Sequence, residues 1–126
     1  MYDFKFFEEV FWEANLCESK KHLHNFTVKN DFAVKFGNKE NYATLKAGAV
    51  VKCVNVIAEG TDIDVVERLR NNHKLQNGST TNKKDWQKVV GNSKVVLQDG
   101  TELPAHIHWY QCANIGKVEF KISKWL

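Results

Sequence analysis

Two histidines and a tyrosine alternate along one stretch near the end of the chain, at positions 106, 108 and 110. Side chains alternate between the two faces of a β-strand, so His106, His108 and Tyr110 are expected on one face. Imidazoles and phenols can accept or donate protons during a reaction. The spacing therefore predicts a site for general acid–base chemistry. The alternative is the ordinary solvated face of an antiparallel sheet, which is normally polar.

A second alternating stretch, from Lys117 to Lys124, follows a turn at residues 113–116. The turn predicts an antiparallel pair whose register places Cys112 opposite Lys117, Tyr110 opposite Glu119, His108 opposite Lys121, and His106 opposite Ser123. The opposite face of the two strands is apolar and is expected in the core; it carries Ile107, Trp109, Val118, Phe120 and Ile122. A slip of one residue would turn these apolar side chains out of the core, which favours this register.

Metal-independent cleavage of RNA is the reaction that these groups fit best. It needs a base for the ribose 2′-OH, an acid for the leaving 5′-oxygen, and cations for the charge on phosphorus. The predicted roles are base and acid for His108 and His106, phosphate binding for Lys121 and Lys117, and proton donation or base stacking for Tyr110. Glu119 is an alternative to one histidine as the second acid–base group. Two histidines on a strand do not complete a metal site, so neither a metal nor a cofactor is expected.

Positive charge is concentrated in one segment, although the net charge of the whole chain is only +3. Residues 68–94 contain seven Lys and Arg side chains and a single acidic residue, Asp85. Such an excess is typical of a surface that binds a polyanion. The residues expected to contact RNA are Arg68, Arg70, Lys83, Lys84, Lys88 and Lys117. The alternative is a solvated basic loop.

The rest of the chain predicts a single α+β domain over residues 1–126, with N-terminal helices followed by a central antiparallel sheet. Residues 1–60 form the first, mixed portion, with an amphipathic helix at Asp3–Leu16 and strands at Asp31–Phe36 and Ala49–Ala58. Residues 61–126 add a helix at Asp62–Asn72, capped by Thr61, a loop at Asn71–Asn82 and the antiparallel sheet. No apolar run is long enough to span a membrane. Three widely spaced cysteines are expected as reduced thiols.

Three segments within residues 84–122 carry a resemblance to a known class of proteins. They are Lys84-Asp85-Trp86-Gln87-Lys88-Val89-Val90-Gly91, Ala105-His106-Ile107-His108-Trp109-Tyr110-Gln111, and Asn114-Ile115-Gly116-Lys117-Val118-Glu119-Phe120-Lys121-Ile122. Together they resemble the end of small toxin domains from bacterial polymorphic and contact-dependent toxin systems. That resemblance implies a barnase-, EndoU-, colicin- or RelE-like ribonuclease fold. The family pattern often has an acidic residue where His106 stands, so the resemblance implies a site at His108, Tyr110 and Lys121.

The expected function is therefore a metal-independent ribonuclease toxin domain. The resemblance implies RNA as substrate, with tRNA among the candidates, a cognate immunity protein as partner, and action in the bacterial cytoplasm after delivery from a neighbouring cell. The alternative is a non-catalytic module, either an immunity protein or a nucleic-acid-binding accessory. The basic segment at residues 68–94 favours the nuclease, because a protein that inhibits a basic nuclease is expected to be acidic.

Overall fold

A computed structural model of the chain describes residues 23–37 and 41–126. In this part, 53% of the residues are in strands and 13% in helices, and five of the strands close into a barrel. The expectation of an α+β fold with N-terminal helices before a central sheet is therefore wrong. The predicted helix at Asp3–Leu16 lies outside the described residues. No helix in the described ranges is long and apolar enough to cross a membrane.

Seven strands form the sheet: β1 (Phe26–Thr27), β2 (Phe32–Phe36), β3 (Asn41–Leu45), β4 (Val50–Glu59), β5 (Trp86–Val96), β6 (Glu102–Cys112) and β7 (Gly116–Trp125). Two 3₁₀ turns, Gly60–Asp62 and Lys83–Asp85, lie on either side of the helix α2 (Val66–Asn72) in the chain. The predicted strands at 31–36 and 49–58 correspond to β2 and β4. The helix begins later than predicted, because residues 60–62 form a 3₁₀ turn and Val65, rather than Thr61, precedes the first helical residue.

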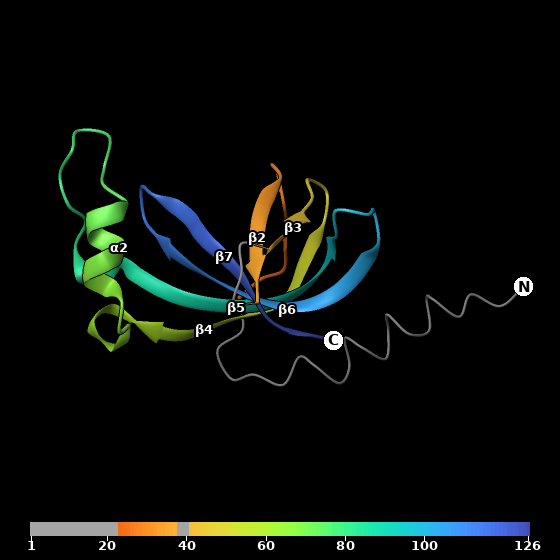
Figure 1. Cartoon of the computed structure of the whole chain (residues 1–126). Coiled ribbons are helices and arrows are strands. Elements are labelled where there is room, and N and C mark those ends of the chain that lie inside the picture. The colour runs from red at the N-terminus through yellow and green to blue at the C-terminus, as the bar shows by residue number, and fades with distance from the viewer. Residues whose placement is uncertain (1–22, 38–40) are drawn as a thin grey trace, which may run out of the picture.

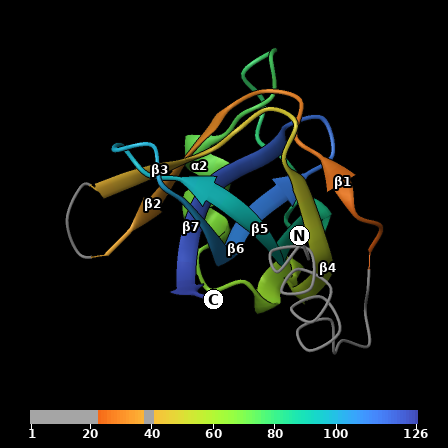
Figure 2. The ribbon, with the colours of Figure 1, turned by 90° about the vertical axis from the view of Figure 1, so that its right-hand side faces the viewer.

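The last three strands form an antiparallel meander, with β5 paired to β6 and β6 paired to β7. The antiparallel pairing of β6 with β7 is predicted by the sequence. The barrel closes through contacts between segments far apart in the chain. Strand β2 runs parallel to β7, and β3, paired with β2, meets the end of β5 at Thr44 and Val96. Figure 2 shows the β2–β3 hairpin and the β1–β4 pair on opposite sides of the molecule.

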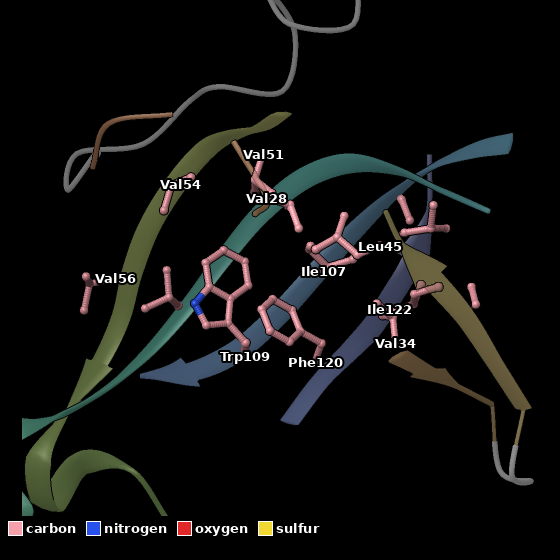
Figure 3. Close-up of a cluster of buried hydrophobic side chains, with 14 residues drawn as sticks. Val28, Val34, Leu45, Val51, Val54, Val56, Ile107, Trp109, Phe120 and Ile122 are labelled. Carbon is pink, nitrogen blue, oxygen red and sulfur yellow. The ribbon is translucent and has the colours of Figure 1, made fainter. Parts of the chain in front are cut away.

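The main hydrophobic core fills the inside of this curved sheet (Figure 3). Trp109 of β6 is fully buried, and its ring lies against Phe120 of β7 with the ring centroids 5.3 Å apart. Ile107 and Ile122 are also buried in this cluster. Four of the five predicted core residues of the last two strands are thus confirmed as core residues.

Val118 is the exception, and a bulge in β7 is the reason. The register between β6 and β7 shifts between the pairs His108–Lys121 and Tyr110–Val118, and Glu119 has a positive φ of 56°. This extra residue turns Val118 to the outer face of the barrel, where it packs against a second cluster. That cluster is built from α2 and the adjoining strand ends, and its buried members are Ile63, Val66, Leu69, Trp86 and Cys112. Helix α2 therefore covers one end of the outer face (Figure 1).

Candidate functional site

The outer face of the barrel carries a row of paired residues that crosses four strands. Tyr42 of β3 pairs with Lys35 of β2, Lys35 pairs with Lys121 of β7, and Lys121 pairs with His108 of β6. We call these four residues the cross-strand row. Neighbouring strands lie about 4.8 Å apart, so the backbones of Tyr42 and His108 are separated by roughly 14 Å. The predicted pairing of His108 with Lys121 is confirmed.

All four residues of the row line one pocket of about 640 Å³. The pocket is bounded by strands β2, β3, β6 and β7 and by helix α2; its other lining residues are Phe32, Ala33, Val65, Arg68, Tyr110, Val118, Glu119 and Phe120. It therefore brings together His108, Tyr110, Glu119 and Lys121 from the predicted site, together with Arg68. A second pocket of about 410 Å³ lies on β4 and β5, away from these groups.

His108 is half-buried and held in its neutral form. Burial, followed by the positive charges of Lys88 and Lys121 and the neighbouring His106, lowers its pKa from 6.5 to about 4. Desolvation and nearby cations both disfavour the charged imidazolium. At neutral pH the ring is therefore uncharged, and the ammonium groups of Lys88 and Lys121 are close enough to act on its pKa.

His106 lies on the same face but outside the lining of that pocket. Its Nδ1 is 2.7 Å from the side-chain oxygen, Oδ1, of the buried Asn92. Because an amide oxygen can only accept a hydrogen bond, we assign the ring proton of His106 to Nδ1. Burial, with a contribution from Lys124, lowers its pKa. A second irregularity pairs His106 with Lys124 instead of the predicted Ser123, whose hydroxyl donates to the His106 carbonyl oxygen at 3.1 Å.

Tyr110 is half-buried and pairs with Val118, so the predicted pairing with Glu119 is wrong. Its ring packs against the second cluster beneath α2. Burial is the main cause that raises the pKa of its hydroxyl, outweighing the attraction of Arg68. The phenol remains protonated at neutral pH and can donate a hydrogen bond or a proton into the pocket.

Glu119 is held by two residues from the helix side of the pocket. Arg68 donates from Nη1 to Oε1 at 2.8 Å, and His73 contacts Oε2 through Nε2 at 2.6 Å. Burial alone would raise the pKa of Glu119, but these hydrogen bonds outweigh it and lower the pKa below 4.5. A carboxylate stabilised in this way is a weak base, so the geometry favours a positioning role over the predicted alternative role in proton transfer.

The Lys and Arg side chains predicted to contact RNA have different surroundings in the structure. Arg70 and Lys83 both bind the carboxylate of Glu67, at 2.8 and 2.9 Å, and Arg70 also donates to the carbonyl oxygen of Thr81. Together they fasten the loop after α2 to the helix. The Lys117 ammonium lies 4.6 Å from the ring centroid of Phe26, while Lys84 is exposed. Among the predicted RNA-contacting residues, Arg68 and Lys88 are the ones beside His108 and its pocket.

Three participants in the site have no clear signal in the sequence. Lys35 and Tyr42 reach it through the pairing of β2 with β7, and His73 reaches it through the bulge at Glu119. The alternation of polar and apolar residues in the predicted strand 31–36 indicates that Lys35 lies on the surface. It does not indicate which residues of other strands lie next to Lys35. Long-range strand pairing supplies that information.

The described residues include neither a cluster of metal ligands nor an exposed free thiol. Within residues 23–37 and 41–126, no three His, Cys, Asp or Glu side chains form a cluster able to hold a metal ion. Cys112 is a buried free thiol whose pKa is raised, chiefly by burial. Cys53 is disulfide-bonded, so the expectation of three reduced thiols is wrong.

The comparisons with known proteins identified no matching family model, no matching curated protein and no matching solved structure.

Proposed function

We propose that the pocket binds RNA and that His108 cleaves it without a metal ion. The observation that carries the proposal is the pocket itself, which places the imidazole of His108 beside its cross-strand partner Lys121, together with the phenol of Tyr110 and the guanidinium of Arg68. Cations bind and stabilise a phosphate, and a neutral imidazole can accept a proton.

The low pKa of His108 in the free protein is compatible with a role as general base, because part of the lowering comes from nearby cations that a bound phosphate would neutralise. Burial is the largest cause, and the charges of Lys88, Lys121 and His106 add to it. A phosphate bound beside the two lysines offsets their effect and raises the pKa of His108 towards the range suited to a general base. Substrate binding would thus activate the base.

In the proposed reaction, the proton of the ribose 2′-OH passes to the imidazole of His108 as the 2′-oxygen forms a bond to phosphorus. The bond from phosphorus to the 5′-oxygen breaks, and that oxygen takes a proton from the hydroxyl of Tyr110. Lys121 and Arg68 stabilise the charge on the phosphoryl oxygens. The products are a 2′,3′-cyclic phosphate and a free 5′-hydroxyl, and the proton on His108 restores Tyr110.

The wider biological setting is part of the same proposal. The resemblance to toxin domains suggests an RNA target in the bacterial cytoplasm, including tRNA, and a cognate immunity protein that would cover the cationic pocket. Electrostatic complementarity predicts an acidic surface on that partner.

A non-catalytic RNA-binding module is the second candidate. Two observations favour it: the pKa of about 4 makes His108 a weak base before substrate binds, and Glu119 is engaged by Arg68 and His73. In this case the pocket would hold a phosphate without breaking it.

The test compares the purified wild type with His108→Ala, Lys121→Ala and the control Lys29→Ala, whose exposed lysine lies outside the pocket. Binding and cleavage of a labelled single-stranded RNA are measured separately, with and without EDTA. We expect His108→Ala to lose about 10²–10⁴ in cleavage rate with binding retained, Lys121→Ala to lose both, and EDTA to have no effect.

Cyclic phosphate ends on the products would support attack by the 2′-OH. Binding without cleavage by the wild type would favour the non-catalytic module, and the absence of both would reject the two candidates. Induced expression in bacteria, wild type against His108→Ala, tests whether growth arrest depends on the same residue.

A further inference from the structure

The far end of the cross-strand row is an exposed aromatic ring. Tyr42 is 43% exposed and lines the same pocket as His108. Within the described ranges, its ring stacks on no aromatic side chain and its hydroxyl makes no hydrogen bond to another side chain. An exposed ring on a sheet surface next to cations is a typical platform for an unpaired nucleobase.

Two lysines occupy the space between Tyr42 and His108. Lys35 and Lys121 are direct partners on the parallel strands β2 and β7, and both are exposed. Neither ammonium forms an ion pair within the described part of the chain. Like charges opposite each other destabilise a sheet, and a bound polyanion removes that cost.

The order of the groups corresponds to the order of groups along a nucleic-acid strand. Moving across the sheet from His108, the row presents a cation on β7, a cation on β2 and then an aromatic ring on β3. These steps cover roughly 14 Å, which leaves room for a second phosphate between the site of cleavage and the ring.

We propose that Tyr42 is a base-stacking subsite for single-stranded RNA, which crosses the strands with one phosphate at Lys121 and His108 and the next at Lys35. The substrate is accordingly an RNA with at least one unpaired nucleotide beyond the phosphate at His108, rather than a base-paired helix. This inference rests on the proposed function, because it places further nucleotides around the same pocket.

The experiment uses the variants Tyr42→Phe, which keeps the ring, and Tyr42→Leu, which keeps an apolar side chain without a ring. Trp125→Leu is a matched control, since this ring is 42% exposed and lies outside the pocket. Each protein is tested on a dinucleotide, which has a single phosphate, and on a pentanucleotide labelled with 2-aminopurine at successive positions.

We expect Tyr42→Leu to weaken pentanucleotide binding by about 5- to 150-fold, the effect of losing one stacked base. Tyr42→Phe and Trp125→Leu should bind as the wild type does, and the dinucleotide should not distinguish among the proteins. Quenching of 2-aminopurine at one position should disappear in Tyr42→Leu and persist in Tyr42→Phe.

Other outcomes separate this inference from the proposed function. If Tyr42→Leu binds the pentanucleotide normally while Lys121→Ala does not, the stacking subsite is wrong and the RNA site stands. If Tyr42→Phe loses as much affinity as Tyr42→Leu, the hydroxyl rather than the ring is responsible, and stacking is rejected. If the wild type binds neither RNA, both proposals fall together.

Discussion

Arg68 of helix α2 donates a hydrogen bond of 2.8 Å to Glu119 of β7, across 51 residues of chain. Glu119 occupies the bulge in β7, and its other carboxylate oxygen contacts His73 just after the helix. The pair therefore attaches α2 to the strand that carries Lys121. It also holds the guanidinium at the edge of the pocket that we propose for RNA.

Replacing Glu119 by Gln should destabilise the protein by about 1 kcal/mol at pH 7, because two charge-assisted hydrogen bonds are weakened in a partly solvated site. The folded-state pKa of Glu119 lies below 4.5, so its contribution is present above that pH and is lost as the pH falls through the folded value. Urea unfolding of both proteins at pH 7 and pH 3 should show the difference shrinking at pH 3. An undiminished difference at pH 3 would mean that the charge of Glu119 is not involved.

The ring of His108 should titrate near pH 4 in the free protein, which NMR of the imidazole resonances can measure. Lys121→Ala removes one of the cations that lower this pKa and should raise it; Lys29→Ala should not. Binding of a non-cleavable RNA analogue should also raise it. A value near 6.5 in the wild type would contradict the electrostatic description of the pocket.

The same titration makes stability depend on pH. The imidazole of His108 has a pKa near 6.5 in the unfolded chain and about 4 in the folded protein, so the unfolded chain binds the proton more readily. The free energy of unfolding therefore decreases as the pH is lowered from 6.5 to 4. His108→Gln cannot take up this proton. On going from pH 7 to pH 5 the wild type should therefore lose more stability than the variant. If the difference in unfolding free energy between the two proteins is the same at both pH values, the pKa of His108 is not lowered by folding.

Trp109→Ala should lower the free energy of unfolding by about 3–5 kcal/mol, because a fully buried aromatic side chain is removed from the core. Trp125→Ala is the matched comparison, with a ring that is 42% exposed, and should cost much less. Denaturant unfolding followed by circular dichroism provides the measurement. Equal effects of the two substitutions would place Trp109 outside a packed core.

Gly91→Ala should also destabilise, by roughly 1–3 kcal/mol, through crowding rather than loss of contact. An added Cβ would lie 2.7 Å from Cγ1 of Val51 and 3.2 Å from Cη2 of Trp109. Combining it with Val51→Ala removes the nearer methyl group, so the double variant should be more stable than the sum of the two single effects predicts. Strict additivity would indicate that the two sites do not touch.

RNA affinity should fall log-linearly with salt, with a slope of about −0.7 for each phosphate contacted. Lys121→Ala should make the slope shallower by about one contact. Lys83→Ala should change it little, because that ammonium is paired with Glu67. If Lys83→Ala changes the slope as much as Lys121→Ala does, RNA binds along the basic segment at residues 68–94 rather than in the pocket.

Local pattern in the sequence determined much of the last third of the fold. Alternation along residues 105–124 and the turn at 113–116 predict two antiparallel strands, the burial of Ile107, Trp109, Phe120 and Ile122, and the pairing of His108 with Lys121. These features follow from short-range geometry, because a tight turn leaves few registers and burial of an apolar face favours one of them. Irregularities in the pairing shift the other three predicted pairs, so that Cys112 pairs with Gly116, Tyr110 with Val118 and His106 with Lys124.

The tertiary structure alone decided which distant segments meet. The closure of the barrel through β2 with β7, the contact of Arg68 and His73 with the bulge at Glu119, and the ion pair of Lys83 with Glu67 all join residues that alternation cannot relate. Pairing between remote strands depends on how the whole core packs, since each edge could accept several partners. For that reason the sequence predicts the pairing of His108 with Lys121, while only the fold brings Lys35 and Tyr42 to the pocket that those residues line and His73 to Glu119 at its edge.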